Sequence, residues 1–148
     1  MHVHVRLTHA EFIQSANAGV LRMAEHRKLN ELGIATKHKY GMSTDDEWTS
    51  LIEGTQAECA LAKALGVYWS GKGEMGGADV GDDYVRQTHH HHGCLILHDE
   101  DKDDRRHYLL TGRNGDFIIR GWAWGYEGKQ KQFWRDPAGG RPAYFVPQ

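Results

Sequence analysis

Up to Gly66, most hydrophobic positions of the chain follow the period of a helix. The short stretch HVHVRL alternates and predicts a strand, and the following Thr8 can cap a helix that runs roughly from His9 to Arg27. A second helix begins at STDDEW, where Ser43 or Thr44 can cap it and the acidic residues suit the helix dipole, and it ends at Gly66. The segment between the two helices has no sustained period and predicts mostly loop.

After the glycine-rich segment SGKGEMGGADVG, the hydrophobic pattern changes to alternation. YVRQTHH, CLILH, RHYLLTG and DFIIRGWAWG predict four strands, and the acidic segment DEDKDD predicts a hairpin turn between the middle two. VYW, just after the second helix, predicts a short strand or an apolar turn. Helices followed by antiparallel strands predict an α+β domain, with the helices packed on a central mixed or antiparallel sheet of about four to five strands.

The length of 148 residues suits one domain with a single core. Within that domain we separate an N-terminal strand, helix and loop (1–44), a core with the main motifs (45–126) and a tail rich in basic and aromatic residues (127–148). The chain has neither internal repeats nor a low-complexity segment beyond a run of histidines.

Composition and charge narrow the function only slightly. The formal net charge of −2 provides no general attraction to nucleic acid, so any such binding must come from a local patch. Cys59 and Cys94 lack the spacing of a zinc site and predict two buried thiols in a reducing compartment. Neither a signal peptide nor a membrane span is recognisable in the sequence, so we predict a cytoplasmic protein.

Glu58 is the residue of the second helix that fits its pattern least. It shares one helical stripe with Leu51, Thr55, Ala62 and Leu65, which is the side that a helix normally buries. A buried carboxylate is rare unless it is paired or binds a metal. Glu58 is therefore either a paired carboxylate at the rim of the stripe or part of a functional site.

Asp79 is the second candidate acid, because it follows the glycine-rich segment and precedes the first of the four strands. Such a loop can aim a carboxylate outward from a sheet edge, although an ordinary turn has the same composition. In the strand that follows, Arg86 provides a nearby cation. Two carboxylates and one cation at a sheet edge suit metal-assisted phosphodiester cleavage, with Mg²⁺ on the acids and the cation on the phosphate. The alternative is a surface salt bridge.

The residues around these candidates resemble a known family. IEGTQAECALAKALGVYW is similar to the first-motif helix, and ADVGDDYVRQT to the motif strand pair, of small phage-type members of the PD-(D/E)xK superfamily, the restriction-endonuclease-like nucleases. The similarity continues through LILHDEDKDDRRHYLLTG, DFIIRGWAWG and GGRPAYFVP, so it spans roughly residues 48–147. The resemblance implies a restriction-endonuclease-like fold, with Glu58 as the helix acid, Asp79 as the strand acid and Arg86 in place of the usual lysine.

The sequence departs from the family pattern at two positions. Tyr84 stands two residues before Arg86, where the family has an acid or a glutamine, and tyrosine is a poor ligand for Mg²⁺. Either Asp83 or its neighbour Asp82 takes that place, Gln87 assists, or the site has lost activity. Arginine binds phosphate but cannot act as a base. We therefore predict Glu58, Asp79 and Asp83 as metal ligands.

Three further segments carry candidate chemistry. The run from His89 to His92 predicts either a transition-metal site or a polar strand end, and His2 and His4 are interpreted in the same way. The tail places Lys129, Lys131, Arg135 and Arg141 around Phe133 and Trp134, a mixture that suits either DNA contacts or a solvated tail pinned by its aromatic residues.

The sequence thus predicts a Mg²⁺- or Mn²⁺-dependent deoxyribonuclease that serves phage or mobile-element DNA metabolism, in the host cytoplasm if phage-encoded. A second hypothesis is a catalytically silent relative that binds DNA or a host or phage protein. A third is a small structural protein of the virion. We leave homodimerisation open, and we predict no membrane partner.

Overall fold

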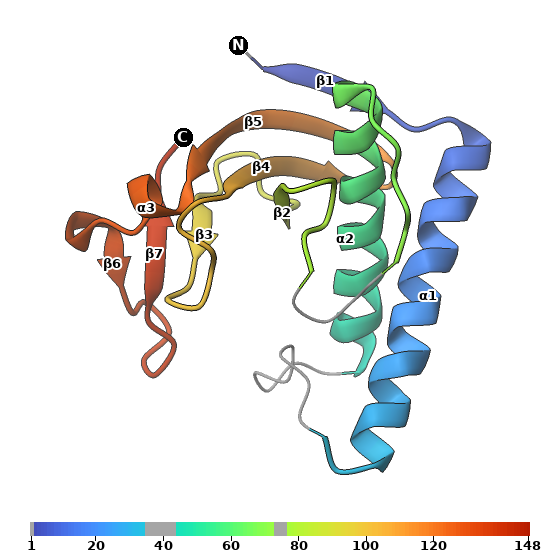
Figure 1. Ribbon diagram of the computed structural model, residues 1–148, viewed down its shortest axis with the longest axis horizontal. Helices are drawn as coiled ribbons and strands as arrows, with labels where there is room; N and C mark the ends of the chain where they lie inside the picture. Colours follow the sequence, from blue (N-terminus) through green and yellow to red (C-terminus); the bar gives the residue numbers. More distant parts are fainter. Residues whose placement is uncertain (1, 35–43, 73–76) are drawn as a thin grey trace.

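The computed structural model describes residues 2–34, 44–72 and 77–148 (Figure 1). Ser43, most of the loop predicted before it and the middle of the glycine-rich segment lie outside the described residues. In chain order the elements are β1 (Val3–Arg6), α1 (His9–Glu31), α2 (Thr44–Leu65), β2 (Tyr84–Thr88), β3 (Leu95–Leu97), β4 (Arg106–Arg113), β5 (Asp116–Trp124), α3 (Gly125–Gly128), a 3-10 turn (Lys131–Phe133), β6 (Trp134–Arg135) and β7 (Ala143–Val146).

The start of α1 and the end of α2 are those that the sequence predicts. At the start of α1, the Thr8 hydroxyl accepts from the backbone N–H of Glu11 at 3.2 Å, while the Glu11 carboxylate accepts from the backbone N–H of Thr8 at 2.7 Å. This reciprocal arrangement satisfies two N–H groups that the helix leaves unpaired. α2 ends at Leu65, and Gly66 follows it with a φ of 67°, the left-handed conformation that glycine adopts without strain. α1 runs one turn further than predicted, to Glu31.

The main sheet is mixed and has four strands in the order β1-β5-β4-β2, which confirms the predicted α+β class. β5 pairs antiparallel with β1 and β4, whereas β2 pairs parallel with β4 and forms one edge. Asn114 and Gly115, with φ values of 56° and 75°, make the tight turn between β4 and β5. The predicted alternating segments therefore form strands, but not all of them are antiparallel.

The prediction of a hairpin turn at DEDKDD is wrong, because the strands on either side of this segment belong to different sheets. β3 pairs with β7 in a small three-stranded sheet of order β3-β7-β6, and β4 lies in the main sheet. The acidic segment is folded around Lys129, which donates to the backbone carbonyls of Asp99, at 2.8 Å, and of Asp101. Lys129 also forms an ion pair of 2.8 Å with Asp103. A cation from the tail thus organises the segment.

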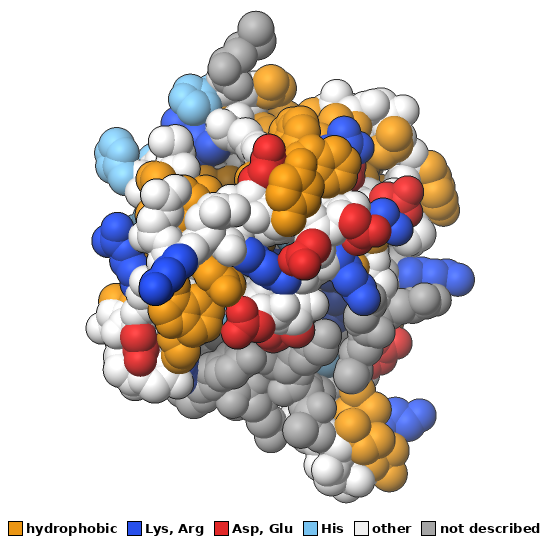
Figure 2. Space-filling view, turned by 60° about the vertical axis from the view of Figure 1, so that its left-hand side comes forward, with side chains coloured by type: hydrophobic (Ala, Val, Ile, Leu, Met, Phe, Trp, Pro, Cys, Tyr) orange, Lys and Arg blue, Asp and Glu red, His pale blue; other side chains and the backbone are white. Residues whose placement is uncertain are grey.

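Two apolar clusters hold these layers together. α2 packs on one face of the main sheet and α1 lies against α2, as Figure 1 shows. The main cluster joins α2 to the sheet and includes Ala57, Leu61, Val85, Leu110 and Phe117. The smaller cluster, Leu95, Leu97 and Leu109, joins the main sheet to the small sheet. The end of the molecule with α3 and the small sheet comes forward in Figure 2, where hydrophobic groups lie beside acidic and basic ones.

Gly19 sets the distance between the two long helices. A Cβ at this position would lie 2.7 Å from the Cα of Ile52 and 2.9 Å from the Thr55 hydroxyl. Such contacts are too short for any side chain, so the absence of a Cβ is what allows α1 to approach α2 this closely. None of the described helices has the length and apolar content that crossing a membrane requires.

Candidate functional site

Glu58 is buried on α2 and paired with an arginine from α1. Its side chain is 6% exposed, and its two oxygens accept from Arg22 Nη1 at 2.6 Å and from Arg22 Nη2 at 2.8 Å. The indole Nε1 of Trp69, from the VYW segment, donates to Glu58 Oε2 at 3.2 Å. The VYW segment forms no strand, and its Trp69 supplies a hydrogen bond to Glu58. Of the predicted stripe, Leu51, Thr55 and Ala62 are buried, while Leu65 is 41% exposed.

Asp79 lies close to this pair. It precedes a tight turn in which Val80 and Asp83 form an isolated antiparallel bridge, and Asp79 Oδ2 accepts from the backbone N–H of Val85 at 2.7 Å. Burial, followed by the negative charge of Glu58, raises the pKa of Asp79 to about 7. The two acids that the sequence analysis singled out, 21 residues apart in the chain, therefore share one electrostatic environment.

Arg22 completes this group, and the sequence analysis missed it. Burial alone would lower the pKa of Arg22, but its hydrogen bonds to Glu58 and the charges of Glu58 and Asp79 raise it. Its Nε is buried without a hydrogen-bond partner among the described residues. A signal existed in the sequence: Arg22 lies three residues after Gly19 and four before His26, both of which α1 buries. A basic residue beside the packing stripe of α1 is the natural partner of an acid on the packing stripe of α2.

Arg86 binds Asp101, and its charge also lowers the pKa of Asp79. Alternation along β2 sends Val85 into the main core and Arg86 to the other face of the sheet. There Arg86 Nη2 binds Asp101 Oδ1 at 2.6 Å and Arg86 Nε donates to the carbonyl of Ile96 at 3.3 Å. Burial alone would raise the pKa of Asp101, but the charge of Arg86 and the N–H of His98 lower it. Tyr84, on the same face as Arg86, stacks on His107 with ring centroids 5.1 Å apart.

Asp83, the third predicted metal ligand, is also paired. Its carboxylate accepts from Arg106 Nε and Arg106 Nη2, both at 2.9 Å, and its side chain is 8% exposed. Only the backbone of Asp83 meets Asp79, whose N–H donates to the Asp83 carbonyl at 2.9 Å. The described residues contain no group of three or more His, Cys, Asp or Glu side chains placed to hold a metal ion.

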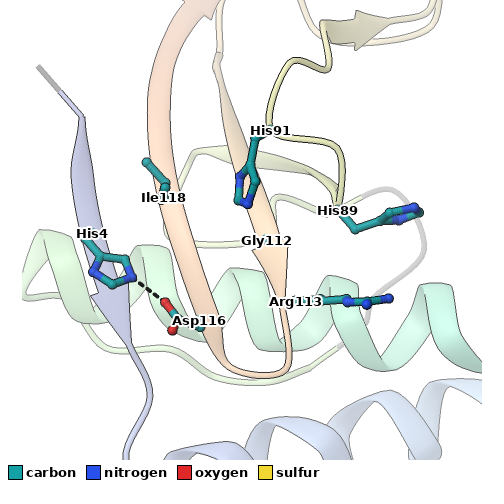
Figure 3. A pocket seen from close by; sticks show the side chains of 7 residues that line it. All are labelled: His4, His89, His91, Gly112, Arg113, Asp116 and Ile118. Atoms are coloured by element: carbon teal, nitrogen blue, oxygen red, sulfur yellow. Dashed lines mark hydrogen bonds and ion pairs between the residues drawn. The ribbon is translucent and has the colours of Figure 1, made fainter.

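The histidine run borders a separate hollow of about 530 Å³ at the turn between β4 and β5 (Figure 3). His4 binds Asp116 across β1 and β5, and the side chains of His89 and Arg113 point in the same direction in Figure 3. His91 Nδ1 lies 3.2 Å from the Thr111 hydroxyl and 3.2 Å from Arg120 Nη2. The run follows the end of β2, as a polar strand end does.

Lys129 and Trp134, from the basic and aromatic tail, have different structural roles. Lys129 is half-buried against the acidic segment, with 13% of its side chain exposed, and so is not part of the exposed basic group that the sequence suggested. Trp134 stacks edge-on against Tyr144, with ring centroids 4.7 Å apart, and joins β6 to β7.

No protein-family model matches the chain, and the comparisons with curated proteins and with solved structures gave no significant match.

Proposed function

We propose that the protein is a metal-dependent nuclease that hydrolyses DNA phosphodiester bonds. The observation that supports this function best is the convergence of Glu58 and Asp79. One comes from the middle of α2 and the other from the turn before the edge strand β2, yet the charge of Glu58 raises the pKa of Asp79. A buried carboxylate and a partly buried one in the same environment are costly for the fold, and Arg22 forms an ion pair with only one of them.

The donor set of this pair suits Mg²⁺ or Mn²⁺. Mg²⁺ is usually held by one or two carboxylates, with substrate phosphates and water completing its coordination. Glu58 and Asp79 would supply those carboxylates, whereas both oxygens of Asp83 are held by Arg106. Bound there, the metal would activate water and neutralise charge on the phosphate.

Arg22 is the cation of this proposed site. In the metal-free protein it neutralises Glu58 through two hydrogen bonds. Because a guanidinium binds carboxylate and phosphate oxygens with the same geometry, Arg22 can turn toward a phosphate when a metal takes over the carboxylate. Arg86, the cation that the sequence predicts for the phosphate, binds Asp101 in the acidic segment, while its charge also acts on Asp79.

The same residues carry the resemblance to PD-(D/E)xK nucleases, and we propose membership of that superfamily together with its restriction-endonuclease-like fold. Two features support the proposal. The charge of an acid on a helix acts on an acid before an edge strand of a mixed sheet, and that helix packs on the sheet. A role in phage or mobile-element DNA metabolism in the cytoplasm follows from the same resemblance.

Cleavage of single-stranded, duplex and branched DNA, with Mg²⁺, with Mn²⁺ and with EDTA, tests this function. We expect metal-dependent cleavage that falls at least about 100-fold in Glu58→Gln and Asp79→Asn, since losing even an outer-shell partner of a metal costs roughly 10–100-fold. Asp104→Asn is the matched control, because that carboxylate is 79% exposed and distant from the pair in the sequence. Calorimetric titration with Mn²⁺ reads metal binding without turnover.

Equal cleavage by wild type, Glu58→Gln and Asp79→Asn would contradict the proposal. So would the absence of both cleavage and Mn²⁺ uptake in a folded wild-type protein, and this result would favour a catalytically silent protein that binds DNA or another protein. Two observations favour that second function. Both carboxylate oxygens of Glu58 are already bound by Arg22. Tyr84, which stands where the nuclease family has a metal ligand, stacks on His107.

A further inference from the structure

Four aromatic side chains form a continuous row along β4, β5 and α3. The ring centroids are 6.2 Å apart from Tyr108 to Trp122, 5.7 Å from Trp122 to Trp124 and 6.4 Å from Trp124 to Tyr126. Tyr108 is buried in the main core, but Trp122 is 48% and Tyr126 is 56% exposed. Large aromatic surfaces of this kind are not needed to close the core, so the exposed part of the row is available to a ligand.

A fixed cation accompanies the row. The guanidinium carbon of Arg106 lies 5.9 Å from the ring centroid of Tyr108 and 5.7 Å from that of Trp122. Register supports this arrangement, because Trp124 pairs with Arg106 and Trp122 with Tyr108, so all four side chains project from the same face of the sheet. Asp83 holds Arg106 through two hydrogen bonds, and 40% of the Arg106 side chain stays exposed.

The row begins beside the proposed catalytic carboxylates. Asp83, which orients Arg106, accepts a backbone hydrogen bond from Asp79 at 2.9 Å. A short chain of contacts therefore leads from Asp79 through Asp83 and Arg106 to Trp122. A ligand lying along the row would contact Arg106, whose partner Asp83 is bonded through its backbone to Asp79.

We propose that this aromatic row binds unpaired bases of single-stranded DNA and so feeds a single strand, or a frayed end, toward Glu58 and Asp79. The inference rests on the proposed nuclease function and names its substrate class. Exposed aromatic rings stack on the faces of bases, and these faces are accessible when the bases are unpaired. The Arg106 guanidinium binds Asp83 through Nε and Nη2 and its side chain is 40% exposed, so Nη1 can donate to a phosphate of the DNA backbone.

Binding in EDTA tests the row without cleavage. The fluorescence anisotropy of a labelled oligothymidine and of a labelled duplex is measured with wild type, Trp122→Ala, Trp122→Phe and Trp48→Ala. We expect Trp122→Ala to bind the single strand about fivefold to 150-fold more weakly, the usual loss for one stacking ring, with little change for the duplex. Trp122→Phe keeps a stacking face and should retain most of the affinity. Trp48, 38% exposed near the start of α2, is the matched control, and its loss should leave the affinity for both DNAs unchanged.

The outcomes separate this inference from the nuclease proposal. Equal affinity of folded Trp122→Ala and wild type for the single strand would contradict the proposed binding role of the aromatic row, whether or not the protein cleaves DNA. Equal losses for single strand and duplex would also overturn it. Self-association of the wild type that Trp122→Ala abolishes, seen by sedimentation without DNA, would assign the rings to a second copy instead. If Trp122→Ala selectively loses affinity for the single strand but the wild type cleaves no DNA, the proposed role of the aromatic row is supported and the nuclease proposal fails.

Discussion

Replacing Arg22 by methionine removes the cation from Glu58 while keeping a long apolar side chain on α1. The two side chains are 16% and 6% exposed, so the substitution leaves a carboxylate that water reaches poorly. Removing one partner of a buried ion pair typically costs about 3–5 kcal/mol, because the remaining charge is uncompensated. Asp79 adds to this cost, since its charge also acts on Arg22. We therefore expect Arg22→Met to lose about 3–5 kcal/mol of unfolding free energy, a large share of the total for a domain of this size.

Urea unfolding at pH 8 in EDTA measures this loss within a double-mutant cycle. Glu58→Gln alone leaves the guanidinium unpaired and should also destabilise, whereas the double variant removes both charges and should lose less than the sum of the two. Arg27→Met is the control, since Arg27 pairs with Glu31 on the surface of the same helix, where the side chains are 81% and 65% exposed. Surface substitutions usually change stability by less than about 0.5 kcal/mol.

Two results would refute this reasoning. If the losses in Arg22→Met and Glu58→Gln simply add, the two side chains do not interact and the electrostatic account of the site is wrong. If Mn²⁺ stabilises wild type and Arg22→Met equally, a metal does not take the place of the guanidinium beside Glu58. We expect Mn²⁺ to stabilise the variant more, because ligands stabilise the state that they bind and the variant has lost its own cation.

Two further predictions concern Asp79 and the helix contact. Because the pKa of Asp79 is raised to about 7, the folded protein keeps a proton that the unfolded chain loses near pH 4, so this residue lowers stability as pH rises from about 4 to about 7. In metal-free urea unfolding, the stability of Asp79→Asn relative to wild type should rise across this pH range, by at most about 4 kcal/mol. Asp83→Asn, the control, should show no such rise. Equal dependence of stability on pH in wild type and Asp79→Asn would contradict the raised pKa of Asp79. Gly19→Ala should destabilise the protein by about 1–3 kcal/mol, because its Cβ would meet the backbone of α2. Gly54→Ala, where the added Cβ has open space, should stabilise it by up to about 1 kcal/mol. Thermal unfolding measures both effects, and an unchanged stability in Gly19→Ala would exclude the close contact between α1 and α2.

Local sequence signals predicted the parts of the fold that depend on neighbouring residues. Thr8 and Glu11 are three residues apart and form the cap that their spacing indicates, and Gly66 ends α2 for reasons contained in its own backbone. The burial of Glu58 also followed from its place on the stripe of α2. These features need no knowledge of distant contacts.

Long-range pairing was the part that the sequence did not reveal. Alternation identifies a strand but carries no information on its partner, so CLILH and RHYLLTG looked like a hairpin. Lys129 and the strand β7, both far along the chain, redirect these segments into separate sheets. Arg22 was missed for the same reason, since its partner Glu58 is 36 residues away on another helix.

The pairing of charges around the edge strand β2 distinguishes Asp79 from the other acids. Glu58, Asp83 and Asp101 each bind an arginine at 2.6–2.9 Å. Asp79 forms no ion pair among the described residues, although it is mostly buried, and accepts a backbone N–H instead. A fold optimised for stability alone would pair this carboxylate or replace it, because its raised pKa marks an unfavourable environment for its charge. The unfavourable charge is therefore concentrated on one residue beside Glu58, where a metal cation would compensate it, and this is why the proposed site is centred on Asp79 rather than on its better paired neighbours.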